Sequence, residues 1–107
     1  MSLAKQYLKD SYKAKVIAGY SYQDVRKRVF CNDGFNVSIQ ASNTCRCTPQ
    51  ENLEDGNYSE VELGFPSDTD DLIIPYAEDP TDVLRTVYNY IPIEIVDELI
   101  KKHGGIK

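Results

Sequence analysis

Apolar and polar residues alternate without interruption over Phe35–Ser42, and this pattern constrains the fold more than any other feature of the chain. In an extended chain such alternation puts one set of side chains in the core and the other in water, which is typical of an antiparallel sheet with one covered face. The inward set is Phe35, Val37, Ile39 and Ala41. Asp33-Gly34 precedes this strand and supplies the positive φ angles of a two-residue hairpin turn. We therefore expect a strand that starts at Val29 to pair with Phe35–Ser42.

Two later segments also have the composition of strands. Glu60–Phe65 alternates, with Glu60 and Glu62 directed outward and the apolar residues directed inward, namely Val61, Leu63 and Phe65. Thr86–Tyr90 is β-branched and aromatic, as strands usually are. Both segments are predicted to join the sheet.

The connections between these strands are predicted from their polar residues and prolines. Asn43–Asn57 is polar and carries Pro49 and Asp55-Gly56, so we expect a loop or a long hairpin connection there. The short apolar run Leu72–Ile74 precedes Pro75, which confines the run to a sheet edge or to the end of a strand.

The first part of the chain has helical periodicity. Ser2 is a suitable N-cap, and apolar residues recur every three to five positions up to Gly19, a natural helix stop. These residues are Leu3, Tyr7, Leu8, Tyr12, Val16 and Ile17. Ser21 to Asp24 is similar to a capping box, which predicts a short second helix over Tyr22–Arg28.

The last part of the chain predicts a C-terminal helix. Pro92 suits the first helical position, Gly104 ends the helix, and one apolar stripe runs between them through Ile93, Val96, Leu99 and Ile100. Acidic residues early in this segment and basic residues late in it complement the helix dipole. We therefore predict a single α+β domain over residues 1–107, an antiparallel sheet with an N-terminal and a C-terminal helix packed on one face.

The charge is segregated along the chain. No Lys or Arg occurs between Cys47 and Leu84, and the acidic residues of that stretch are Glu51, Glu54, Asp55, Glu60, Glu62, Asp68, Asp70, Asp71, Glu78, Asp79 and Asp82. Such a stretch is either a solvated surface that keeps the protein soluble or a face for a basic partner. If it binds a partner, we predict that the contacts come from Glu60, Glu62, Asp68, Asp70, Asp71, Glu78, Asp79 and Asp82.

A second candidate surface lies in the basic first part. Arg26 and Arg28, with Tyr20 and Tyr22 beside them, form an alternative set for a nucleotide or a nucleic acid. The formal net charge of −5 disfavours direct binding of nucleic acid, because the chain would repel a phosphate backbone.

The residues that carry catalytic or metal chemistry are few. His103 is the single histidine, and its place in the last helical turn already gives it a structural role. The three cysteines are Cys31, Cys45 and Cys47, and the last two are separated by one residue, closer than zinc ligands usually stand. We expect free thiols and no metal or cofactor, with a reactive thiol beside Arg46 as a weaker redox alternative. The acidic turn at Asp68–Asp71 does not have the glycine and glutamate of a calcium loop, and no phosphate-binding or serine-hydrolase motif occurs.

Several motifs between residues 31 and 106 resemble a family of small proteins encoded by phages and prophages. They are Cys31-Asn32-Asp33-Gly34-Phe35, Ser38-Ile39-Gln40-Ala41-Ser42, Val61 to Ser67, Tyr76-Ala77-Glu78-Asp79, Thr86-Val87-Tyr88, and the ending from Ile91 through Glu94 and Lys102 to Ile106. The resemblance implies a phage context and carries over no enzymatic activity and no binding residue. Small acidic phage proteins without catalytic motifs often act by binding a host protein.

From these observations we predict a non-enzymatic phage-type accessory protein that binds a host protein. A more specific form of this prediction is an anti-defence, anti-CRISPR-like inhibitor that binds its target through an acidic face. The partner would then be a nucleic-acid-binding defence complex. A protein that sequesters a nucleotide signal is the alternative, followed by a structural phage protein, and an enzyme with a Cys nucleophile ranks last. The sequence is also compatible with a homo-oligomer. The first residues do not have the order of a secretory signal, and no apolar run approaches the roughly 20 residues that span a bilayer, so we expect a protein of the host bacterial cytoplasm without membrane contact.

Overall fold

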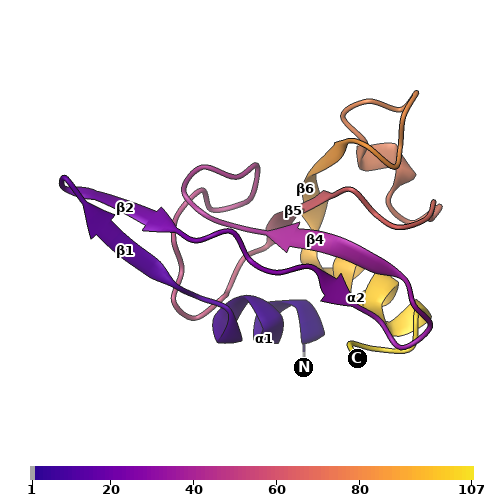
Figure 1. The fold of residues 1–107 in the computed structure, drawn as a ribbon, viewed down its shortest axis with the longest axis horizontal. Helices are drawn as coiled ribbons and strands as arrows, with labels where there is room; N and C mark the ends of the chain where they lie inside the picture. The colour runs from indigo at the N-terminus through magenta and orange to yellow at the C-terminus, as the bar shows by residue number, and fades with distance from the viewer. Residues whose placement is uncertain (1) are drawn as a thin grey trace.

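The computed structural model describes residues 2–107, which fold into a small antiparallel sheet with a helix from each end of the chain and a separate hairpin (Figure 1). This arrangement confirms the predicted α+β class. The elements are α1 (Leu3–Asp10), β1 (Ala14–Ile17), β2 (Tyr20–Gln23), β3 (Val29–Phe30), β4 (Asn36–Gln40), β5 (Glu60–Gly64), the short 3-10 helix η1 (Ile74–Tyr76), β6 (Val87–Pro92) and α2 (Ile93–Lys102).

The main sheet has the strand order β3-β4-β5-β6, and each strand pairs antiparallel with the one before it. Ile39 of β4 lies opposite Leu63 of β5, and Val61 lies opposite Ile91 of β6. All four side chains are buried in one core. The period-two alternation in β4 and β5 therefore predicted the covered face of the sheet correctly.

Both helices supply the other side of that core. The predicted stripe of α2 is buried, and in α1 the buried residues are Ala4 and Leu8. Asp97 of α2 joins the two helices, because its Oδ1 atom accepts hydrogen bonds from the Ala4 amide at 2.8 Å and from the Ser2 hydroxyl at 2.9 Å. Ser2 also caps α1 as predicted, since its hydroxyl oxygen accepts from the Lys5 amide. No helix within residues 2–107 is long and apolar enough to cross a membrane.

The prediction for residues 11–28 is wrong. α1 ends at Asp10 instead of continuing toward Gly19, residues 14–23 form the β1–β2 hairpin, and residues 24–28, expected in a second helix, lie in no helix or strand. Ala18 and Gly19 turn this hairpin with φ angles of 53° and 83°, the left-handed values that a two-residue turn requires. β-branched Val16 and Ile17 just before the turn favour the strand over the helix.

Two shorter predictions in the second half of the chain are also wrong. β5 ends at Gly64, and Phe65 leaves the sheet with a φ angle of 50° and an exposed side chain, so it is not the third inward residue. Leu72–Ile74 belongs to a turn that continues into η1 and is not a strand, although Ile73 is fully buried. In both places the apolar pattern predicts more strand than the chain forms.

Candidate functional site

The β1–β2 hairpin carries the clearest exposed apolar surface among the described residues. Ile17 pairs with Tyr20, and Lys15 pairs with Tyr22. Because residues that lie opposite each other in an antiparallel pair share a face, these four side chains line one side of the hairpin. We call it the hairpin face, and it consists of Lys15, Ile17, Tyr20 and Tyr22. Ile17, Tyr20 and Tyr22 are 54%, 68% and 45% exposed.

The opposite side of the hairpin is held by the loop that follows β4. The Asn52 side-chain amide donates to the Ser21 hydroxyl oxygen, and the Asn43 side-chain amide donates to the Ser21 backbone oxygen, both at 2.9 Å. These bonds attach the hairpin at Ser21, and Val16, the residue paired with Ser21, is 73% exposed. It extends from the rest of the molecule along the longest dimension, which measures 40 Å (Figure 1). The hairpin face is therefore held in place and left uncovered.

The lysines of the hairpin do not form a free basic patch. Lys15 Nζ lies 3.2 Å from a carboxylate oxygen of Asp24, and Lys13 Nζ lies 3.9 Å from the other one. All three side chains are solvent-exposed, so these pairs contribute little to stability. Their positive charge is nevertheless partly balanced, and the hairpin face is mainly apolar and aromatic.

The alternative ligand set of Arg26, Arg28, Tyr20 and Tyr22 is not brought together. Arg26 is buried, and its guanidinium donates to the Ala41 oxygen at 2.6 Å, to the Ser11 hydroxyl oxygen at 2.8 Å and to the Leu8 oxygen at 3.2 Å. Burial lowers the pKa of Arg26, and contact with the Leu8 carbonyl near the end of α1 gives the cation a structural role. Arg28 instead binds Asn36 and the backbone oxygen of Phe65.

The predicted acidic residues differ in exposure and in their contacts. Asp70 is buried. Glu60 and Glu62 lie on the outward side of β5 as predicted, but each is half-buried and accepts a local hydrogen bond, from the Thr48 hydroxyl and from the Arg46 amide respectively. Asp79 accepts from the Thr81 amide and hydroxyl, Asp82 pairs with Arg85, and Glu78 lies 3.9 Å from the Arg46 guanidinium. The predicted residues that are exposed are Asp68, Asp71, Glu78 and Asp79.

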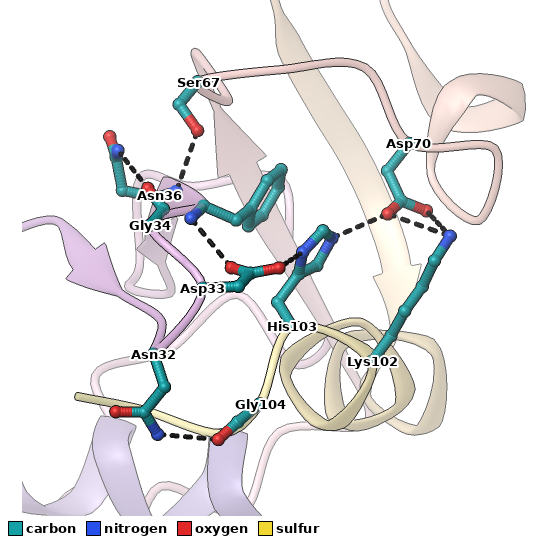
Figure 2. A network of polar contacts seen from close by, with 10 residues as sticks. Asn32, Asp33, Gly34, Asn36, Ser67, Asp70, Lys102, His103 and Gly104 are labelled. Carbon is teal, nitrogen blue, oxygen red and sulfur yellow. Dashed lines mark hydrogen bonds and ion pairs between the residues drawn. The ribbon is translucent and has the colours of Figure 1, made fainter.

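A polar network joins the end of α2 to two loops (Figure 2). His103 Nδ1 lies 2.6 Å from Asp33 Oδ2, and its Nε2 lies 2.8 Å from Asp70 Oδ2. Lys102 Nζ also contacts Asp70 at 3.1 Å. The His103 ring stacks on Phe35 with centroids 4.0 Å apart. The His103 imidazole thus contacts two carboxylates instead of the free carbonyls at the helix end, which its backbone amide bonds, and it connects segments that lie far apart in the sequence.

The charges and hydrogen bonds of this network shift the pKa values of His103, Asp33 and Asp70. Burial opposes protonation of His103, but the hydrogen bonds and charges of Asp33 and Asp70 outweigh it and raise the pKa of the imidazole. The Phe35 amide and His103 lower the pKa of Asp33. For Asp70, burial acts in the opposite direction, and bonds from the Leu72 amide, His103 and Lys102 overcome it and lower the pKa. The arrangement favours a cationic His103 between two carboxylates.

The β3–β4 turn that carries Asp33 is one residue longer than predicted. The Gly34 amide donates to the Cys31 oxygen at 3.0 Å, and the Cys31 amide donates to the Phe35 oxygen at 2.8 Å. Asn32, Asp33 and Gly34 thus form the loop, with Gly34 at a φ angle of 98°. The Asp-Gly signal located the turn correctly and predicted its length wrongly.

Comparison of the chain with protein-family models, with curated proteins and with solved structures found no match. The resemblance of residues 31–106 to phage and prophage proteins stays a prediction from the motifs of the sequence.

The cysteines were the candidate metal and redox residues of the sequence. Cys31 and Cys47 are buried, all three thiols are free, and within residues 2–107 no group of histidine, cysteine and acidic side chains is arranged to hold a metal ion. Burial raises the pKa of Cys45, and it raises that of Cys47 to about 11. The expectation that Arg46 activates a neighbouring thiol is therefore wrong, because desolvation of the thiolate dominates.

The sequence interpretation missed two members of the hairpin face. The helical periodicity placed Lys15 and Ile17 in the N-terminal helix, whereas Tyr20 and Tyr22 were recognised as candidate binding residues for a different ligand. A usable signal was present, because Ala18-Gly19 separates two β-branched residues from an alternating Tyr-Ser-Tyr segment.

Proposed function

We propose that this chain is a non-enzymatic, phage-type accessory protein that acts by binding a host protein. The observation that carries the proposal is the hairpin face, on which Ile17, Tyr20 and Tyr22 gather in water at the end of a projecting hairpin. Single exposed apolar residues are ordinary, but a contiguous group on an extended element is typical of a protein contact surface. Tyrosine is enriched in such surfaces because it offers a large contact area at low entropic cost.

The hairpin has little use as a stabilising element. Two-stranded hairpins are marginally stable in water, and this one contributes none of the residues of the buried core. Exposed apolar side chains on it do not stabilise the fold, whereas they would gain free energy on contact with an apolar partner surface. A binding role accounts for an arrangement that folding alone does not require.

The structure favours a protein partner over a nucleotide. Arg26 is committed to backbone carbonyls, and Asp24 partly balances Lys13 and Lys15, which weakens the hairpin as a cationic clamp for phosphate. Cys31 and Cys47 are buried with raised pKa values, which argues against a Cys nucleophile.

The anti-defence form of the proposal rests on the exposed carboxylates. Asp68, Asp71, Glu78 and Asp79 face water and can meet a basic partner, and their field would accelerate association in a salt-dependent manner. In this proposal the hairpin face supplies most of the affinity, and the acidic face steers the partner. This acidic face consists of Asp68, Asp71, Glu78 and Asp79, and the buried Asp70 does not belong to it.

The experiment is capture of a partner from a bacterial lysate, followed by titration of the purified partner with matched variants. Ile17→Ser combined with Tyr20→Ser should weaken binding at least about tenfold, or about 1.4 kcal/mol. Leu84→Ser, which also removes an exposed apolar side chain but lies outside the hairpin, should leave affinity unchanged. Asp68→Asn with Asp71→Asn should mainly slow association and reduce its dependence on salt.

Three results would contradict the proposal. The first is a hairpin variant that binds the partner as tightly as the parent chain does, and the second is a captured partner that is another copy of this chain. The third is excess absorbance of the purified chain near 260 nm that the hairpin variant loses. The last result would establish the nucleotide alternative instead, and the absence of tryptophan from the sequence makes that absorbance easy to measure.

A further inference from the structure

Both ring nitrogens of His103 face carboxylate oxygens, Nδ1 toward Asp33 and Nε2 toward Asp70 (Figure 2). An ionised carboxylate only accepts hydrogen bonds, and a neutral imidazole has one donor and one acceptor nitrogen. Both contacts can be hydrogen bonds at the same time only when the ring carries two protons. The geometry of the site is therefore that of the cationic form.

The charged groups around the ring come from each element that packs against it. The β3–β4 turn supplies Asp33, the segment before η1 supplies Asp70, and α2 supplies Lys102, which also contacts Asp70. Asp68 lines the same cleft, which has a volume of about 350 Å³, and makes no direct contact with the ring. The two carboxylates in contact with the imidazole, Asp33 and Asp70, therefore favour its charged form.

The two carboxylates differ in access to water. The side chain of Asp70 is 3% exposed, and that of Asp33 is 48% exposed. If the ring loses one proton, one carboxylate loses one of its hydrogen-bond donors. Water can replace that donor at Asp33, whereas Asp70 is shielded from water and would keep only the Leu72 amide and Lys102 as donors. The remaining proton is therefore expected on Nε2.

We propose that His103 is a pH-operated latch: as the cation it joins Asp33 and Asp70, and after losing a proton it keeps Asp70 and releases Asp33. The raised pKa of His103 puts the opening on the alkaline side of about pH 6.5, the ordinary midpoint of a free imidazole. The latch does not depend on the proposed binding function.

Opening the latch loosens a defined part of the chain. Residues 103–107 run beside the β3–β4 turn, where the Asn32 amide donates to the Gly105 oxygen at 3.0 Å and the Asp33 amide donates to the His103 oxygen at 3.2 Å. Cys31 forms a bridge with Ile106 in the same region. Loss of the Asp33 contact removes one of the links that hold this segment, while the Asp70 contact continues to hold the segment before η1.

Nuclear magnetic resonance of the isotope-labelled full chain tests the latch. Nitrogen shifts of the imidazole across a titration from about pH 5 to 9 report its pKa and its neutral tautomer. We expect a pKa above that of free imidazole and an Nε2–H tautomer after deprotonation. Amide exchange of Asn32 and Asp33, corrected for the intrinsic effect of pH, should accelerate about threefold relative to the amides of β5 as the ring deprotonates.

Two variants separate the latch from a general structural role of the histidine. Asp33→Asn should lower the pKa of His103 and abolish the pH-dependent acceleration, whereas Asp68→Asn should leave both nearly unchanged. An Nδ1–H tautomer at high pH, or exchange at Asn32 and Asp33 that does not change across the titration of His103, would overturn the proposal. The tautomer and the amide exchange rates are both measured on the parent chain, so they test the latch even if a variant fails to fold.

Discussion

Gly56 lies so close to α1 that a Cβ atom on it would come within 2.6 Å of the Lys5 backbone oxygen. The same atom would lie 2.7 Å from the Lys9 amide nitrogen, and Gly56 has a φ angle of 69°. The long loop between β4 and β5 thus passes directly over the N-terminal helix, and only a residue without a side chain allows this approach.

Gly56→Ala is therefore expected to destabilise the fold by about 2–5 kcal/mol, the sum of left-handed strain and overpacking against backbone. Gly34→Ala is the matched control, because Gly34 also has a positive φ angle but a Cβ atom on it would meet nothing within 4 Å. The control should cost only about 1–2 kcal/mol. Urea unfolding of the two variants measures the difference, and equal losses would contradict close packing of this loop on α1.

Asp70→Ala should cost roughly 1–3 kcal/mol, because it removes the acceptor of the Leu72 amide and of the two cations at the end of α2. Asp71→Ala, an exposed neighbour, should change stability by less than about 0.5 kcal/mol. Chemical denaturation compares them. The acidic turn therefore cannot be neutralised as a unit without an effect on folding, and similar stabilities for the two variants would contradict this difference.

Leu99→Ala should destabilise the protein by about 2–5 kcal/mol, since Leu99 of α2 is fully buried in the core. Glu98→Ala removes an exposed side chain from the same helix and should be nearly neutral. Thermal unfolding followed by circular dichroism gives the comparison. A melting temperature of Leu99→Ala equal to that of the parent would show that the stripe does not hold the core.

The pH dependence of stability follows from the directions of the pKa shifts. A raised folded pKa makes the contribution of His103 complete below about pH 6.5 and lost as pH rises through the folded value. Lowered folded pKa values make the contributions of Asp33 and Asp70 present above about pH 4 and lost at more acidic pH. The melting temperature should therefore be highest between these limits. His103→Gln should reduce the fall of the melting temperature at alkaline pH. If the fall is as large as in the parent chain, groups other than His103 cause it.

The thiols should react slowly in the folded protein. Cys31 and Cys47 are buried, and burial raises the pKa of Cys47 to about 11, so little thiolate forms near neutral pH. Alkylation followed by peptide mapping should label Cys45 first, and all three cysteines in denaturant. Rapid labelling of Cys47 in the native state would show that its thiol is accessible.

The parts of the fold that the sequence predicted are those in which periodicity is local and uncontested. The alternation in β4 and β5 and the stripe of α2 each place their apolar residues on one side, and the structure buries those residues. Gly104, with a φ angle of 89°, follows α2 where a helix stop was expected. In these segments the residue pattern allows one arrangement only.

The N-terminal region was decided by tertiary contacts. Val16 and Ile17 fit a helical face as well as a strand, so their spacing alone does not distinguish the two. The hairpin is selected where Ser21 meets Asn43 and Asn52, residues more than twenty positions away along the chain. No local pattern contains that information.

The candidate sites depended even more on distant contacts. Composition identified Asp70 and Arg26 as charged residues, and charged residues are usually exposed. Asp70 is buried because Lys102 and His103 reach it from the end of α2, and Arg26 is buried because Leu8 and Ala41 present carbonyl oxygens to it. The sequence by itself determined the sheet, the C-terminal helix and the segregation of charge, whereas only the tertiary structure decided which charges are structural and which surface is left open, since burial is set by partners that come together on folding.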